Sequence, residues 1–196
     1  MLRNKLSEAI KALQNGRIVV YPTDTLYAIG VNIYNYDAVR KVFKIKKRPL
    51  DIPLPVAVRN FTEMKKIAFI NYNAMVLAKH FLPGSLTLVL NKKNIVPDIV
   101  TSGLNKIAVR IPNNTIALEL LASSGPLTVT SANIHDMKTQ GNIKDIRMQF
   151  KNDDVAIYLD YGVLQGNPST IIDVSSNETK IIREGSIKKN DILAVI

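Results

Sequence analysis

Hydroxyl and carboxylate side chains gather near the start of the chain, where an apolar segment ends. Residues 18–21 are apolar and predict a buried strand, and Pro22 interrupts that strand because it has no amide N–H to donate. Four polar residues follow within five positions: Thr23, Asp24, Thr25 and Tyr27. Their three hydroxyls and one carboxylate could bind a polar small molecule, or they could cap the backbone of a turn.

An arginine inside an apolar segment is a second candidate for chemistry. Arg110 lies within residues 107–111, which are otherwise Ile, Ala and Val. A buried guanidinium needs an anionic partner, and the carboxylate of a bound substrate could supply it through two parallel hydrogen bonds. An internal ion pair with one of the 16 acidic residues is the alternative.

Positive charge is concentrated as well as abundant. The chain has 26 Lys and Arg against 16 Asp and Glu, a formal net charge of +10. The densest cluster consists of Arg40, Lys41, Lys44, Lys46, Lys47 and Arg48. This charge favours anionic partners, but it does not distinguish nucleotides from nucleic acids or acidic membrane surfaces. A solvated helix face would account for the same cluster.

Several classes of protein are excluded or unsupported. The chain has no Cys, which excludes disulfides, thiolate metal sites and Cys nucleophiles. It contains no G-x-x-x-x-G-K-[ST], G-x-G-x-x-G, H-E-x-x-H or G-x-S-x-G pattern, so a P-loop, a dinucleotide-binding turn, a zincin and a hydrolase elbow are unsupported. Residues 1–5 lead into an amphipathic segment instead of a signal peptide or membrane span. We therefore expect a soluble, cytoplasmic protein that does not contact the membrane.

Helices and strands that could position these side chains alternate along the chain. Apolar spacing and polar caps predict helices over 5–15, after Asn35 or Asp37, after Asn60, after Asn71, over 113–122 and over 190–195. Short aliphatic segments predict strands over 18–21, 28–33, 56–58, 86–90, 107–111, 127–130, 155–159, 170–174 and 180–183. The composition is 46% hydrophobic but only 6% aromatic, which fits β-branched strands covered by aliphatic helices. We expect one α/β domain over residues 1–196, with a mixed sheet.

Polar motifs recur where these elements end. In chain order they are Pro22-Thr23-Asp24-Thr25-Leu26-Tyr27, Lys46-Lys47-Arg48-Pro49, Pro83-Gly84-Ser85-Leu86-Thr87, Ala108-Val109-Arg110-Ile111-Pro112, Thr130-Ser131-Ala132-Asn133, Pro168-Ser169-Thr170-Ile171-Ile172-Asp173 and Ile182-Arg183-Glu184-Gly185. Each motif is weak by itself. The ordered set resembles the YrdC-like family, the threonylcarbamoyl-adenylate synthases, from about Lys5 to the C-terminus.

The resemblance implies an α/β (α+β) fold in which helices flank a twisted, open mixed sheet around a deep basic cavity. It implies a nucleotidyltransferase that converts L-threonine, bicarbonate or CO₂, and ATP into threonylcarbamoyl-AMP and pyrophosphate. A separate threonylcarbamoyl transferase would then modify an adenosine of tRNA. The chain resembles the short form of the family, because no further domain follows residue 196 in this sequence.

The resemblance also assigns roles to individual side chains. The residues similar to those that hold threonine are Thr25, Arg110, Ser131 and Ser169. The residues similar to those that hold ATP are Lys46, Arg48, Asn133 and Arg183. Tyr27 and Thr139 are additional candidates for the site. Mg²⁺ is expected as the cofactor carried with ATP, since the sequence shows no dedicated carboxylate cluster and hence no metal site of its own.

Some positions depart from the family pattern. Ile134-His135-Asp136 follows Asn133, where the family usually has one variable residue and then Ser-Gly, so the nearby phosphate loop is expected to differ. Ala28 stands where a Gly is usual, and Ile52 and Ala57 stand where some members have polar residues. These changes bear on substrate detail and rate more than on the fold.

Two other functions stay open. A basic concave domain could bind tRNA or double-stranded RNA without chemistry, in line with the net charge. A related enzyme could form a carbamoyl-adenylate on an acceptor other than threonine. A steep salt dependence would identify the first alternative, and the dependence on the amino acid would identify the second.

Overall fold

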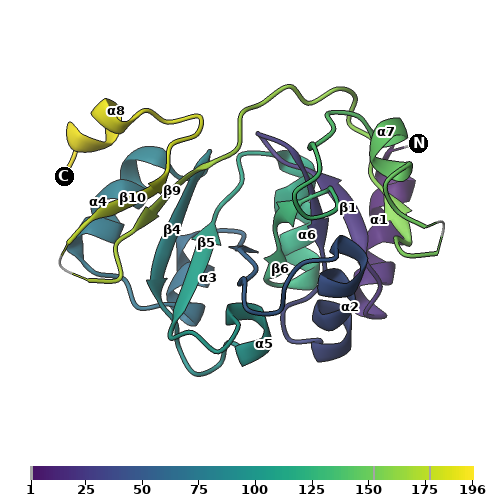
Figure 1. Ribbon diagram of the computed structural model, residues 1–196, viewed down its shortest axis with the longest axis horizontal. Helices are drawn as coiled ribbons and strands as arrows, with labels where there is room; N and C mark the ends of the chain where they lie inside the picture. The colour runs from purple at the N-terminus through teal and green to yellow at the C-terminus, as the bar shows by residue number, and fades with distance from the viewer. Residues whose placement is uncertain (1, 152, 177) are drawn as a thin grey trace.

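Two β-sheets carry the strands of this fold, and helices pack against them (Figure 1). The computed structural model describes residues 2–151, 153–176 and 178–196. The strand order is β7-β2-β1-β8 in the four-stranded sheet and β10-β9-β4-β5-β3-β6 in the six-stranded sheet. The predicted α/β class, with open mixed β-structure and flanking helices, is confirmed. The structure adds that the strands divide between two sheets.

The four-stranded sheet is built on the hairpin that contains Pro22. Its strands are β1 (Val19–Pro22), β2 (Tyr27–Gly30), β7 (Thr130–Ser131) and β8 (Ile157–Tyr158). β1 pairs antiparallel with β2 and parallel with β8. The helices α1 (Leu2–Gln14) and α6 (Thr115–Ser124) pack on this sheet, with Leu13 and Leu120 in the shared core. The helices predicted over 5–15 and 113–122 are confirmed within three residues at their ends.

The six-stranded sheet contains the Arg110 segment. Its strands are β3 (Val56–Ala57), β4 (Leu86–Asn91), β5 (Lys106–Arg110), β6 (Leu127–Thr128), β9 (Thr170–Asp173) and β10 (Lys180–Arg183). β4 lies between β5, which is antiparallel to it, and β9, which is parallel. This register brings the start of β4, the end of β5 and the start of β9 to one edge of the sheet.

Six further helices surround these sheets in the part of the chain that the structure describes. They are α2 (Tyr36–Lys46), α3 (Phe61–Ile67), α4 (Tyr72–Phe81), α5 (Asp98–Thr101), α7 (Ile143–Arg147) and α8 (Lys189–Leu193). The short helices α5 and α7 are not predicted by the sequence pattern. Among the described residues, no helix is both long enough and apolar enough to cross a membrane.

Asparagine side chains begin several of the helices. Asn35, Asn60 and Asn71 each accept a hydrogen bond from the backbone N–H three residues later, which confirms them as caps. Asn114 makes the same bond at the start of α6, one residue after the predicted start. Each bond satisfies one of the amide groups that the first turn of a helix leaves without an intrahelical partner.

The strand predicted over 127–130 is divided between the two sheets. β6 pairs with β3 in the six-stranded sheet, and β7 pairs with β2 in the four-stranded sheet. Between them, the backbone N–H of Val129 donates to the carbonyl of Pro55 at 2.8 Å. The switch joins the sheets covalently and delivers Ser131 to the hairpin that carries Thr25.

A long connection crosses between the sheets at the top of the view in Figure 1. It leaves β8 after Tyr158 and reaches β9 at Thr170. Most of its residues are exposed, and it belongs to neither sheet. It brings Ser169 to the edge of the six-stranded sheet where β4 begins.

Candidate active site

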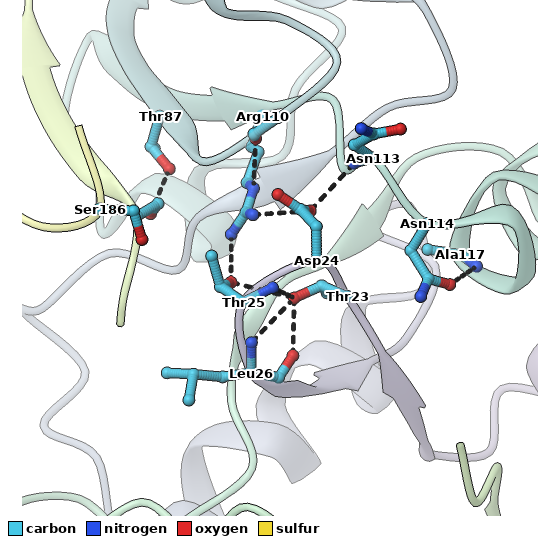
Figure 2. Close-up of polar contacts among 12 residues, drawn as sticks. Thr23, Asp24, Thr25, Leu26, Thr87, Arg110, Asn113, Asn114, Ala117 and Ser186 are labelled. Atoms are coloured by element: carbon cyan, nitrogen blue, oxygen red, sulfur yellow. Dashed lines mark hydrogen bonds and ion pairs between the residues drawn. The ribbon is translucent and has the colours of Figure 1, made fainter. Parts of the chain in front are cut away.

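The turn between β1 and β2 satisfies its own backbone through one hydroxyl. Thr23 Oγ1 donates to the carbonyl of Leu26 at 2.6 Å and accepts from the N–H groups of Leu26 and Thr25 at 3.1 and 3.2 Å. The capping interpretation of this stretch is therefore correct for Thr23. The side chains of Asp24 and Thr25 are left to face β5, as Figure 2 shows.

Arg110 meets both of these side chains. Its Nη1 donates to Thr25 Oγ1 at 2.8 Å, and its Nε donates to the carbonyl of Gly84 at 2.9 Å. Its Nη2 lies 2.8 Å from Asp24 Oδ1, so the internal ion pair that the sequence left open is present (Figure 2). Asp24 Oδ1 also accepts from the backbone N–H of Asn113 at 2.9 Å.

The guanidinium of Arg110 is almost completely buried, with 4% of the residue exposed. Burial lowers the pKa of Arg110, and the charge of Asp24 opposes this shift. The Nη2 atom is close to Asp24 but has no hydrogen bond of regular geometry within the described residues. A buried arginine with unused donor capacity is suited to a planar anion such as a carboxylate.

Ser169 and Arg183 lie beside this arginine. Ser169 Oγ is 2.8 Å from Thr87 Oγ1, and Arg183 donates from Nε and Nη2 to the carbonyl of Ser169 at 3.1 and 2.8 Å. Burial lowers the pKa of Arg183, and the positive charge of Arg110 lowers it further. A second positive charge beside Arg110 favours an anion near both guanidinium groups.

The residues around these two arginines are called the Arg110 cluster below; they are Asp24, Thr25, Thr87, Arg110, Ser169 and Arg183. Sheet register explains their convergence. Leu86 of β4 is opposite Thr170 of β9, and Leu88 of β4 is opposite Val109 of β5. The residues next to these pairs therefore meet at one edge.

A second polar cluster surrounds Lys46, of which only 1% is exposed. Its ammonium donates to the carbonyls of Ser131 and Asn133 at 2.6 and 2.5 Å. Ser131 Oγ donates to Asn133 Oδ1 at 2.5 Å. Burial, and then the charge of Arg48, lower the pKa of Lys46 to about 7. We call Lys46, Ser131 and Asn133 the Lys46 cluster.

Arg48 lies just past the end of α2. Lys47 ends the helix in the left-handed conformation, with φ 51°. Arg48 then turns to donate to the carbonyls of Ile52 and Pro53 at 3.0 and 2.9 Å. Burial lowers the pKa of Arg48, and the negative charge of Asp136 opposes this shift.

The other cations of α2 and of the two residues that follow it line a surface hollow. The hollow has a volume of about 650 Å³, and its basic lining residues are Arg40, Lys41, Lys44, Lys47 and Arg48. All of these except Arg48 are exposed, as a solvated helix face would be. Lys46 is the member of the sequence cluster that points inward. A separate apolar hollow of about 420 Å³ lies between α3 and α4.

The structure groups the predicted residues differently from the sequence assignment. Ser131 is predicted to bind the substrate threonine, but it lies in the Lys46 cluster with Lys46 and Asn133, which are predicted to bind ATP. Arg183 was assigned to ATP but lies in the Arg110 cluster. Ser131 is opposite Ala28 in the β2–β7 pair, three residues from Thr25, so the two clusters share the hairpin. The binding roles themselves, and the deep basic cavity, stay predictions.

Three candidates lie outside these clusters, namely Arg48, whose bonds are described above, Tyr27 and Thr139. The hydroxyl of Tyr27 is bonded to the backbone of residues 161 and 162, and Thr139 is half-buried in the loop after Asn133. The sequence reasoning missed the roles of Asp24 and Thr87. The signal for Thr87 was a hydroxyl within the apolar segment of β4, where burial requires a partner.

The loop after Asn133 keeps a glycine-like backbone despite its different residues. Asp136 has φ 62°, in the left-handed region that glycine favours and that Asp tolerates. The Nε2 atom of His135 lies 3.6 Å from Asp136 Oδ1. Asp136 therefore takes a glycine-like conformation and adds a carboxylate whose charge acts on Arg48, and a changed phosphate loop stays a prediction. Among the described residues, no group of three or more His, Cys, Asp or Glu could hold a metal ion.

Comparisons with known proteins point to one family. Residues 11–185 match the family model Sua5_yciO_yrdC, described as telomere recombination. A putative threonylcarbamoyl-AMP synthase of Methanocaldococcus jannaschii is 42% identical over 187 residues, which cover 94% of this chain and 88% of that protein. The threonylcarbamoyl-AMP synthase of Pyrococcus abyssi is 34% identical over 195 residues, covering 98% of this chain and 57% of that protein. This chain therefore spans little more than half of the Pyrococcus relative.

Solved structures agree with this assignment. The structure of Pyrococcus abyssi Sua5 complexed with L-threonine matches 97% of this chain and 57% of that chain, with a TM-score of 0.93 and 34% identity. The structure of Escherichia coli YciO matches 98% of this chain and 94% of that chain, with a TM-score of 0.87 and 26% identity.

Proposed function

The chain belongs to the Sua5/YciO/YrdC family, and from that premise we propose that it is a threonylcarbamoyl-AMP synthase. The substrates are L-threonine, bicarbonate or CO₂, and ATP with its Mg²⁺, and the products are threonylcarbamoyl-AMP and pyrophosphate. One observation carries the proposal: a buried arginine, bonded to a threonine hydroxyl, retains donor capacity in a fold whose Pyrococcus relative was solved with L-threonine.

Threonine is held by the Arg110 cluster in this proposal. Its carboxylate binds the guanidinium of Arg110, sharing it with Asp24 or displacing Asp24 from it. The hydroxyls of Thr25 and Ser169 bind the remaining polar groups of the amino acid, and each charge-assisted hydrogen bond contributes about 1.5–3 kcal/mol. A site with buried hydroxyl partners rejects valine, because an isostere without the OH group leaves those partners unpaired.

ATP is held by the cations that flank this site. Lys46, Arg48 and Arg183 stabilise the negative charge that develops on the α-phosphoryl oxygens and the departing pyrophosphate. Asn133 and Ser131 add neutral donors. The nucleotide would bind as its Mg²⁺ complex, in which the ion would neutralise part of the phosphate charge.

The chemistry then depends on positioning. The threonine amine attacks the carbon of CO₂, forms the N–C bond and loses a proton, which yields a carbamate. A carbamate oxygen attacks the α-phosphorus of ATP, and the bond to the β-phosphate oxygen breaks to release pyrophosphate. No protein side chain acts as a nucleophile, so the contribution of the enzyme is to align the reactants and stabilise charge.

Other parts of the proposal concern partners. The threonylcarbamoyl group passes to a separate transferase that modifies tRNA, and the reaction takes place in the cytoplasm, where ATP and tRNA occur together. Direct tRNA or double-stranded RNA binding is a second candidate function, supported by the hollow that the exposed cations of α2 line.

Pyrophosphate release tests the proposal. Purified protein is supplied with Mg²⁺, ATP and bicarbonate, with or without L-threonine, and with valine or serine as controls. Threonine-dependent release is expected, with little release with valine. Release that depends equally on another amino acid would indicate a different acceptor. No release with any amino acid, together with tRNA binding that weakens steeply with salt, would replace the synthase by an RNA-binding function.

A further inference from the structure

The connection between β8 and β9 packs on Thr25, leads to Ser169 of the Arg110 cluster, and has few attachments along its first part. Residues 160–168 are called the crossing segment here. Within the described residues, its backbone hydrogen bonds include one from the N–H of Leu164 to the carbonyl of Gly141 at 2.8 Å, and one from the N–H of Ser186 to the carbonyl of Pro168 at 3.0 Å. Neither attachment lies in the first part of the segment.

Tyr27 supplies the attachment there. Its hydroxyl accepts from the backbone N–H of Tyr161 at 2.8 Å and donates to the carbonyl of Gly162 at 2.7 Å. The phenol therefore uses its donor and an acceptor on consecutive residues of the segment. Gly162 has φ +84°, and its own N–H is bonded to Asp160 Oδ1 at 3.0 Å. The turn thus presents its backbone to Tyr27.

The crossing segment then packs on the backbone of Thr25. A Cβ atom at Gly166 would lie 2.4 Å from the Thr25 carbonyl oxygen and 2.8 Å from its Cα. The hairpin therefore contacts the segment at two points, first through the Tyr27 hydroxyl and then through Thr25. Ser169 follows at the end of the segment, where Thr87 and Arg183 bind it.

We propose that Tyr27 is a positioning residue that holds the crossing segment, and thereby sets Ser169 relative to Thr25 and Arg110. The inference rests on the proposed function for its catalytic consequence, because Thr25 and Ser169 hold the same threonine in that proposal. Both hydrogen bonds of the Tyr27 hydroxyl go to the segment, so in this proposal Tyr27 acts on the substrate only through Ser169. Tyr27 holds the start of the crossing segment, and Ser169 follows the end of that segment.

The test is the Tyr27→Phe variant, which keeps the ring and removes both hydrogen bonds. Hydrogen exchange of the amides of Tyr161 and Leu164, whose N–H groups are bonded to Tyr27 and Gly141, should become faster by on the order of tenfold, the size expected for two lost hydrogen bonds of ordinary strength. The KM for threonine should rise by about as much, while the KM for ATP stays near the wild-type value.

Tyr21→Phe is the matched control. Tyr21 lies in the same hairpin, and its hydroxyl makes one buried hydrogen bond to the carbonyl of Thr128 at 3.0 Å. This variant should lose stability without a change in threonine KM or in exchange of the crossing segment. Equal changes in threonine KM for both variants, or unchanged exchange in Tyr27→Phe, would overturn the positioning role.

The two proposals fail in distinguishable ways. If the wild-type protein shows no threonine-dependent pyrophosphate release, the proposed function is wrong. The exchange comparison needs no substrate and still decides whether Tyr27 holds the crossing segment. If the wild type is active and the exchange result is negative, the function stands and the role of Tyr27 is withdrawn.

Discussion

Replacing Arg110 by lysine is expected to weaken both the fold and threonine binding. The guanidinium donates to Gly84 and Thr25 and forms an ion pair with Asp24, with all three distances between 2.8 and 2.9 Å. These partners lie on two segments of the chain, the turn at Asp24 and Thr25 and the start of β4 at Gly84. A lysine ammonium is a single point charge and reaches at most one of the three partner atoms well. Arg110→Lys therefore keeps the positive charge but loses the planar group that bonds to several partners at once.

The size of the effect follows from the bonds that are lost. Hydrogen bonds to charged groups contribute about 1.5–3 kcal/mol each, and the variant loses two of them while Asp24 still offsets the retained charge. We expect the free energy of unfolding to fall by about 3 kcal/mol. For a chain of this size that corresponds to a fall of about 6–12 °C in the unfolding midpoint.

Two assays on the same protein measure the two consequences. Thermal unfolding gives the midpoint, and threonine-dependent pyrophosphate release gives the threonine KM, which should rise at least about tenfold, or ~1.4 kcal/mol. Arg59→Lys is the control, because Arg59 is exposed and makes no ion pair within the described residues. A variant whose midpoint and threonine KM both match the wild type would refute the role assigned to this guanidinium.

Three further changes test other parts of the structure. Burial lowers the pKa of Lys46 to about 7 from 10.5, so the unfolded chain binds more protons between these values, and the free energy of unfolding should rise with pH across that window. Urea unfolding at several pH values should show this rise in the wild type and its loss in Lys46→Met. Gly166→Ala places a Cβ atom against the backbone of Thr25 and should cost about 1–3 kcal/mol of stability, seen as a lower thermal midpoint; an unchanged midpoint would contradict the close packing. Asn71→Ala removes a helix cap and a 2.6 Å hydrogen bond to the carbonyl of Val174, and should lower the urea unfolding free energy by about 2 kcal/mol with normal threonine KM, whereas a loss below about 0.5 kcal/mol would mean that the cap is dispensable.

Local features were readable from the sequence because their causes are local. Asn35, Asn60 and Asn71 cap helices through a bond that spans three residues. Pro22 ends β1 because it lacks an N–H group. Thr23 closes the turn with its immediate neighbours. The asparagine caps and Thr23 each bond to a backbone group within three residues, and Pro22 acts through its own missing N–H group.

The residue types of the site were also evident. An arginine within an apolar strand requires an anionic or polar partner wherever it lies, so Arg110 stood out before its surroundings were known. That the residue is an arginine did not show which group is its partner. The candidates included a substrate carboxylate and each of the acidic residues, and strand pairing brought Asp24 to it across 86 positions of sequence.

Tertiary structure decided how the side chains are grouped. Ser131 joins Lys46, and Arg183 joins Arg110, because β7 pairs with β2 while β9 and β10 extend the other sheet. The division of segment 127–130 between two sheets was equally invisible, since a short, largely buried segment could belong to either sheet. The bond from Tyr27 to Tyr161 spans 134 positions. The sequence by itself determined which side chains need partners and where the chain turns. Sheet register and the path of the crossing segment decided which partners those side chains meet, because such contacts exist only after distant strands have paired.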